Sequence, residues 1–189
     1  MKLNFDSNQV YQKEAVESVI RLFEGQPLKR GDFELAGESD LGFKEEGFGN
    51  PKVLPEETVL QNLKDVQKFN EIEQSGKLEK LSFPDADENG ISIKTECAFP
   101  NFTIEMETGT GKTYVYLRTI YELNKLYGFQ KFVIVVPSVA IREGVIKNLE
   151  ITHEHFQELY NKVPVKFDVY DSKKIVQLKN FAVNNNIQI

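Results

Sequence analysis

Residues 106–113 read METGTGKT, and they decide the fold expected for this chain of 189 residues. The run FTIEM (102–106) before them is typical of a buried strand, and the run YVYLRTIYEL (114–123) after them is typical of a helix. A strand that enters a glycine turn and then a helix directs several backbone N–H groups, and the positive end of the helix, at one point. The stretch therefore predicts a phosphate-binding loop.

The residue types in this loop suit a nucleoside triphosphate. Gly111 permits a backbone conformation that a Cβ would obstruct. Lys112 would reach the β- and γ-phosphates, and the hydroxyl of Thr113 would ligate a bridging magnesium ion. ATP and magnesium are the predicted cofactors, with Lys112 and Thr113 as the catalytic pair and Thr113 as the metal ligand. The predicted cofactor-binding residues of the loop are Thr108, Gly109, Thr110, Gly111, Lys112 and Thr113.

Met106 stands where the phosphate-loop template has its first glycine. This position lies at the end of the strand and makes no essential phosphate contact, and helicase-type motors tolerate other small or apolar residues there. Met106 at this position therefore favours a helicase-like motor, and nucleotide binding is still predicted.

Composition and charge restrict the class of protein. With 40% hydrophobic and 28% charged residues the chain is typical of a soluble globular protein, and no window is apolar enough for a membrane helix or a signal peptide. We therefore expect a cytoplasmic protein with no membrane partner. The single cysteine, Cys97, excludes an intrachain disulfide. Residues 1–100 carry 12 basic and 20 acidic side chains and residues 101–189 carry 11 and 9, so phosphate contacts are expected in the second half.

Periodicity divides the chain into three parts. Apolar spacing predicts an amphipathic helix over 7–24, a glycine-rich loop or loosely paired hairpins over 25–53, and a helix from Pro55 to about Ser75. After residue 91, strands and helices alternate: strands at 102–106, 131–136 and 165–170, helices at 112–128, 138–160 and 172–183, and the start of a strand at 187–189. Repeated strand–helix units predict an α/β fold, a parallel sheet with helices on both faces.

Three stretches carry a resemblance to a known family. METGTGKTYVYLRTIYELNK (106–125), GFQKFVIVVPSVAIREGV (128–145) and ITHEHFQELY (151–160) resemble the restriction (Res) subunit of type III restriction-modification enzymes, which is related to superfamily 2 helicases. The resemblance implies an incomplete RecA-like P-loop NTPase domain with an acidic inserted segment. The expected parts are the Q-motif helix at 1–24, the insertion at 25–100 and the P-loop part of the first motor domain at 101–189.

The resemblance also implies roles for residues outside the loop. YQKEAV (11–16) resembles the Q motif, in which Gln12 would address adenine through its amide, a group that both donates and accepts hydrogen bonds. VVPSVAIREG (135–144) is similar to motif Ia, which grips the nucleic-acid backbone through Pro137, Ser138 and Arg142. Family members use ATP to move along or switch on double-stranded DNA, cut it with a separate nuclease domain, and depend on a methyltransferase (Mod) subunit as partner.

The sequence departs from a complete motor in one respect. ATP hydrolysis needs an acid that holds magnesium and a carboxylate that orients water. No apolar strand ends in Asp-Glu here, because FVIVVPS (132–138) ends without an acid and Lys166 interrupts VKFDVYDS (165–172). The family pattern places this motif after a strand that begins at IQI (187–189). We therefore expect an N-terminal fragment of a longer polypeptide that binds nucleotide weakly without turning ATP over.

Other interpretations stay open at this level. Asp171 and Lys173 have the D-x-K spacing of magnesium-dependent nucleases, although the preceding strand offers no second acid. His153 and His155 lie on different faces of a helix, so ordinary surface or packing roles are favoured over a shared metal. The chain could also belong to another superfamily 2 helicase or translocase, or could only dock a partner without catalysis.

Overall fold

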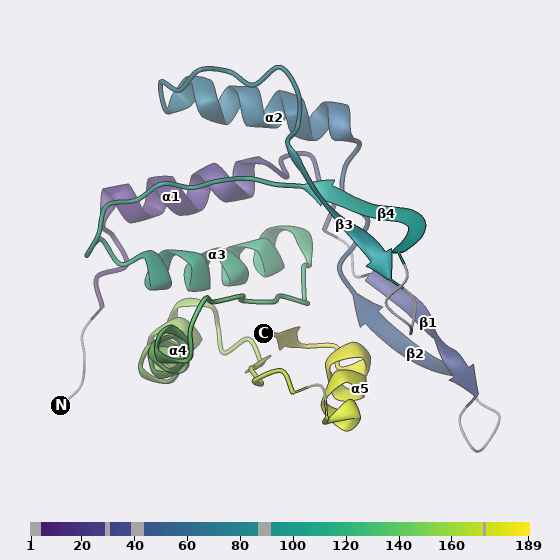
Figure 1. Cartoon of the computed structure of the whole chain (residues 1–189). Coiled ribbons are helices and arrows are strands. Elements are labelled where there is room, and N and C mark those ends of the chain that lie inside the picture. Colours follow the sequence, from purple (N-terminus) through teal and green to yellow (C-terminus); the bar gives the residue numbers. More distant parts are fainter. Residues whose placement is uncertain (1–4, 29–30, 39–43, 87–91, 172) are drawn as a thin grey trace.

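The computed structural model describes residues 5–28, 31–38, 44–86, 92–171 and 173–189. These ranges form a mixed α/β arrangement in which most of the core is helical (Figure 1). In chain order the elements are α1 (Val10–Arg21), β1 (Gly31–Glu38), β2 (Lys44–Gly49), α2 (Glu56–Phe69), β3 (Lys80–Ala86), β4 (Ser92–Pro100), α3 (Lys112–Tyr127), α4 (Val139–Leu159), β5 (Val165–Lys166), α5 (Ile175–Val183) and β6 (Ile187–Gln188).

Three helices are stacked at one side of the molecule, with α1 between α2 and α3 (Figure 1). Each presents apolar side chains at helical spacing to its neighbour: α1 buries Val16, and α2 buries Val59 and Val66. The predicted helices at 7–24 and 55–75 are confirmed, although both are shorter than expected. The helix that follows the loop begins where the sequence predicted and ends at Gly128, whose φ of 79° provides the left-handed C-cap.

Two antiparallel hairpins project from this helical stack (Figure 1). β1 pairs with β2 inside the glycine-rich stretch, as the prediction of loose hairpins allowed, whereas the β3–β4 hairpin was not predicted. Asn50, directly after β2, ties the first hairpin to the second half of the chain: its Oδ1 accepts from Gln130 N at 2.7 Å and Lys131 N at 2.9 Å, and its Nδ2 donates to Lys131 O at 2.8 Å. The predicted insertion at 25–100 includes residues 29–30, 39–43 and 87–91, which lie outside the described residues.

Within the described residues, the extended parallel sheet predicted from the sequence is not formed. Parallel pairing there is confined to β5 with β6 and to a bridge between Lys131 and Gln188, so β6 lies between the other two segments. The predicted strands at 102–106 and 131–136 are not strands: Lys131 makes a single bridge, and Val133 and Val135 are 79% and 87% exposed. The physical reason is non-local: a parallel strand depends on partners at its edges, and beyond Phe132 no described segment pairs with this stretch.

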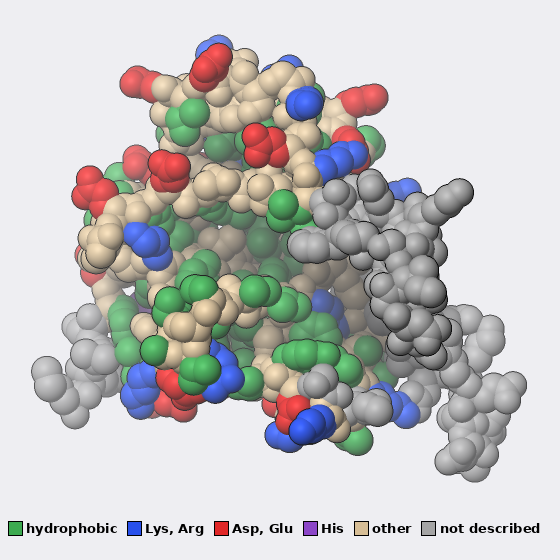
Figure 2. Space-filling view, viewed as in Figure 1, with side chains coloured by type: hydrophobic (Ala, Val, Ile, Leu, Met, Phe, Trp, Pro, Cys, Tyr) green, Lys and Arg blue, Asp and Glu red, His purple; other side chains and the backbone are tan. Residues whose placement is uncertain are grey.

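The main core lies between α3 and α4. It is a cluster of buried residues, most of them aromatic: Tyr114, Leu117, Ile120, Tyr121, Phe156, Tyr160 and Ile187. On the face shown in Figure 2, acidic side chains are spread over the upper part of the molecule and hydrophobic side chains gather in the hollow centre. No helix in the described ranges is long and apolar enough to cross a membrane.

Candidate nucleotide site

The loop between residues 106 and 113 is a compact turn that closes on itself. Gly109 and Gly111 both have left-handed backbones, with φ of 85° and 84°, which explains why glycine stands at these two positions. The hydroxyl of Thr110 donates to Glu107 O at 2.7 Å and so fixes the width of the turn. Thr108 lies at the apex of the turn, between these two anchored ends.

Gln12 contacts the loop from α1. Its side chain is 7% exposed, and its Nε2 donates to Thr110 O at 2.9 Å. A Cβ added at Gly111 would lie only 2.7 Å from this Nε2, so α1 and the loop approach as closely as a residue without a side chain allows. The structure thus brings together two predicted site residues that are 98 positions apart in the chain. The observed contact of Gln12 is with the loop backbone, and its contact with adenine stays a prediction.

Lys112 folds back over the loop. Its Nζ donates to Met106 O at 2.5 Å and to Glu107 O at 2.7 Å. These carbonyls end the segment that precedes the turn, so the ammonium group lies against the start of the loop. Because Gly111 is the N-cap of α3 and provides no side-chain cap, the N–H groups of the first turn, including that of Thr113, remain available to an anion.

The arrangement fits the phosphates of a nucleotide. It combines a left-handed glycine pair, an uncapped helix N-terminus and one ammonium group over the same turn. The hydroxyl of Thr113, in the first turn of α3, is the oxygen that the predicted magnesium ion would use. No cluster of three or more acidic, histidine or cysteine side chains suited to a metal occurs among the described residues, so a protein-only metal cage is not present there.

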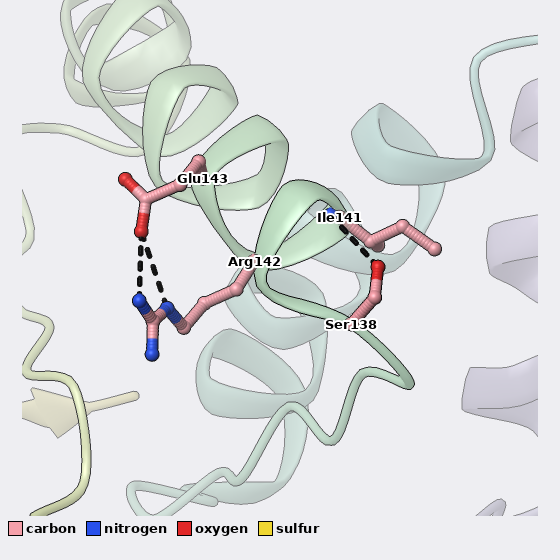
Figure 3. A network of polar contacts seen from close by, with 4 residues as sticks. All are labelled: Ser138, Ile141, Arg142 and Glu143. Atoms are coloured by element: carbon pink, nitrogen blue, oxygen red, sulfur yellow. Dashed lines mark hydrogen bonds and ion pairs between the residues drawn. The ribbon is translucent and has the colours of Figure 1, made fainter.

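The predicted nucleic-acid contacts lie apart from the loop, in the first turn of α4. Ser138 is the N-cap, and its Oγ accepts from Ile141 N at 3.3 Å, as the sequence predicted for a helix beginning here. Arg142 pairs with Glu143 Oε1, with nitrogen–oxygen distances of 3.0 and 3.2 Å. Figure 3 shows the guanidinium and the Ser138 hydroxyl on different sides of the turn, so they do not converge on one phosphate position. Pro137 is exposed just before them.

Comparison with known proteins supplies the family. The family described as "Type III restriction enzyme, res subunit" matches residues 7–188, nearly the whole chain. The chain belongs to this Res subunit family. The match includes the 106–113 loop, Gln12 and the first turn of α4, so the resemblance noted from the sequence is confirmed.

Curated relatives agree with this assignment to the Res family. The chain is 32% identical over 173 residues to the type III restriction-modification enzyme EcoPI Res subunit of Escherichia phage P1, a match that covers 90% of this chain and 15% of the relative. It is 37% identical over 118 residues to the EcoP15I Res subunit of Escherichia coli, covering 61% and 10%. It is 50% identical over 62 residues to the StyLTI Res subunit of Salmonella typhimurium, covering 32% and 6%. The chain thus spans about 15% of the length of the first relative.

The D-x-K pair that suggested a nuclease has a structural role in this Res-family chain. Asp171 Oδ1 accepts from Lys173 N at 3.0 Å, and its Oδ2 pairs with Lys174 Nζ at 3.7 Å. The carboxylate therefore closes the turn that leads into α5. Together with the lack of a metal-binding cluster in the described ranges, this contact gives the nuclease interpretation no support.

Sequence reasoning missed the contact that joins the loop helix to α4. The hydroxyl of Tyr114 lies 2.8 Å from Nε2 of His155, and Phe5 stacks on the Tyr114 ring and contacts the His155 ring in a tilted arrangement. Burial lowers the pKa of His155, and the nearby Arg118 lowers it further. For His155 the sequence predicted only an ordinary surface or packing role, and the structure gives it a packing role. Its partner could not be named, because the pair is 41 positions apart.

Proposed function

We propose that this chain is the ATP-binding portion of the helicase-like motor of a type III restriction Res subunit. In this proposal residues 1–24 provide the Q-motif helix, residues 101–189 the P-loop part of the first motor domain, and residues 25–100 an insertion. The complete enzyme would couple ATP hydrolysis to movement on double-stranded DNA before cleavage, with a Mod methyltransferase subunit as partner. Family membership supports the motor, and the geometry of the 106–113 loop supports the nucleotide.

The observation that carries the proposal is the position of Lys112. Its ammonium group already lies over the turn, held by two backbone carbonyls, and needs only to exchange these acceptors for phosphate oxygens. The helix N-terminus and the left-handed glycines supply N–H groups on the same side. Thr113 would hold magnesium, and Gln12 would secure the loop and reach the base. Magnesium would neutralise the phosphate charge when bound.

Binding of MgATP to the 189-residue chain, measured by calorimetry, tests this proposal. The Lys112→Ala variant should bind at least about tenfold more weakly, because a charge-assisted contact to phosphate is worth about 1.5–3 kcal/mol. Lys125→Ala is the matched control, since Lys125 lies on the exposed side of the last turn of the same helix and should leave the affinity unchanged. Absence of saturable, magnesium-dependent binding by the unmodified chain, or equal affinity of the two variants, would refute the proposal.

The nucleic-acid side of the proposal has its own measurement. Pro137, Ser138 and Arg142 are proposed to contact the DNA backbone, and Arg142 would have to exchange Glu143 for a phosphate. Arg142→Ala should therefore weaken binding to duplexes of unrelated sequence by the same factor and lower the salt dependence of that binding. Lys147→Ala, one helical turn and a half further along α4, is the control and should change neither.

A further inference from the structure

We propose that Tyr114 is a positioning residue for the phosphate-binding loop, and that it acts through its hydrogen bond to His155. The inference rests on the proposed nucleotide-binding function and extends it to a residue outside the loop. Neither side chain would touch the nucleotide. Their contact would fix where the first turn of α3, and with it Lys112 and Thr113, stands relative to the rest of the domain.

Tyr114 is the first firmly anchored side chain after the loop. Gly111 and Lys112 are exposed and Thr113 is half-buried, whereas Tyr114 is the first buried residue of α3. Its ring is held on several sides: it stacks on Phe5 with centroids 6.1 Å apart and on Phe156 with centroids 5.1 Å apart. The direction in which α3 leaves the loop therefore depends on how this ring is seated.

The hydrogen bond between Tyr114 and His155 prevents the Tyr114 ring from sliding. Stacking contacts allow a ring to slide within its plane, but the 2.8 Å contact between the Tyr114 hydroxyl and His155 Nε2 sets the position of the ring along α4. His155 is fixed in turn by its contacts with Phe5 and with the Phe156 ring beside it. Arg118, one turn beyond Tyr114, donates to Ser7 O at 2.7 Å and so holds the N-terminal segment close to Tyr114.

The loop is anchored at both of its ends. Gln12 of α1 donates a hydrogen bond to Thr110 O, just before Gly111, and Tyr114 anchors α3 just after the loop. Lys112 and Thr113 lie between these two anchors, so a loss at either anchor should loosen them. Because α4 is continuous from Val139 to Leu159, the same contact joins the loop to the helix that carries Ser138 and Arg142.

A second buried tyrosine provides a matched control. Tyr160, the C-cap of α4, donates a hydrogen bond from its hydroxyl to Glu122 Oε1 at 2.7 Å and thus makes another link between α3 and the end of α4. Glu122 lies about two turns further from the loop than Tyr114 does. Tyr114→Phe and Tyr160→Phe each remove one buried hydroxyl and keep the ring, so a purely structural role predicts the same consequences for both.

The experiment compares MgATP affinity and thermal stability of the unmodified chain and the two variants. We expect Tyr114→Phe to raise the dissociation constant about three- to tenfold, and Tyr160→Phe to change it by less than about twofold, while both lower the melting temperature to a similar extent. In His155→Phe the ring contacts remain and the hydrogen-bonding nitrogen is lost. It should reproduce the effect of Tyr114→Phe, and the double variant should lose no further affinity. Equal affinities of the two tyrosine variants would overturn the inference.

A measurement without nucleotide separates this inference from the proposed function. The amide of Val115 donates to Gly111 O at 3.0 Å, which is the hydrogen bond that closes the first turn of α3. Tyr114→Phe should accelerate hydrogen exchange at this amide and Tyr160→Phe should not. Unchanged exchange in Tyr114→Phe would refute the positioning role even if ATP binds. A chain that binds no ATP would refute the proposed function, and an exchange difference would then still show that Tyr114 orders the loop.

Discussion

The aromatic cluster between α3 and α4 is closed to solvent, whereas the groove beside residues 132–136 is open. Neighbouring parts of the chain form both. In the cluster, Phe156 is 1% exposed and lies within 5.1 Å of both the Tyr114 and the Tyr121 rings, measured between centroids. The groove, of about 450 Å³, lies between residues 132–136, α4, residues 167–171 and α5, and leaves Val133 and Val135 mostly exposed. Both surfaces are apolar, so hydrophobicity alone does not explain the difference.

The difference follows from where backbone hydrogen bonds are made. A helix satisfies its interior N–H and C=O groups by itself and needs only one apolar face covered, which α3 and α4 do for each other. A parallel strand depends on neighbouring strands for the same groups. Residues 130–132 find such a neighbour in β6, through Gln188 N to Gln130 O at 2.7 Å and Phe132 N to Gln188 O at 2.9 Å. The following residues find none in the described part of the chain, and the groove opens there.

The largest expected effect contrasts the closed and the open region directly. Phe156→Ala should lower the free energy of unfolding by about 3–5 kcal/mol, because it empties the centre of the aromatic cluster. Val135→Ala removes apolar atoms from an exposed side chain and should change the free energy of unfolding by less than about 0.5 kcal/mol. Urea denaturation followed by circular dichroism measures both. A comparable loss in Val135→Ala would mean that the groove is closed in solution, and the comparison would fail.

The next effect concerns the loop that the closed region supports. Gly111→Ala should lower the free energy of unfolding by about 1–3 kcal/mol and abolish nucleotide binding, because φ is 84° and the new Cβ would press on Gln12 Nε2. Gly144→Ala is the control with the opposite sign. It lies inside α4, its Cβ would meet nothing within 4 Å, and helix propensity should raise stability by up to about 1 kcal/mol. Two variants that behave alike would contradict this account of the glycines.

A smaller effect tests whether the first hairpin depends on the second half of the chain. Asn50→Ala removes three hydrogen bonds to the backbone of Gln130 and Lys131 and should cost about 1–2 kcal/mol, together with faster hydrogen exchange at those two amides. Asn148→Ala, which loses one bond to Gly144 O within its own helix, should be nearly neutral. Slow exchange at residues 130 and 131 in Asn50→Ala would show that β6 alone holds this segment.

The sequence predicted best what depends on neighbours along the chain. The glycine turn, the Ser138 cap, the helix stop at Gly128 and the helices α3 and α4 each follow from a local signal, and each is confirmed. The predicted strands at 102–106 and 131–136 are wrong because pairing partners are not encoded locally. For the same reason Gln12 was assigned to the base while its contact with Thr110 O was not foreseen, and the Tyr114–His155 pair was missed.

The smallest expected effect is a dependence of stability on pH through His155. Burial, followed by the charge of Arg118, lowers its pKa in the folded chain, and Glu158 opposes this in part. Below the unfolded pKa of about 6.5 the unfolded chain binds more protons than the folded chain, so stability is fully present above that pH and falls as pH decreases towards the folded pKa. Melting temperatures between pH 7.5 and 5.5 should therefore decrease less in His155→Phe than in the unmodified chain. Identical pH profiles would mean that the folded chain does not resist protonation of the His155 imidazole. The packing around the contact between Tyr114 and His155 would then be looser than the geometry indicates.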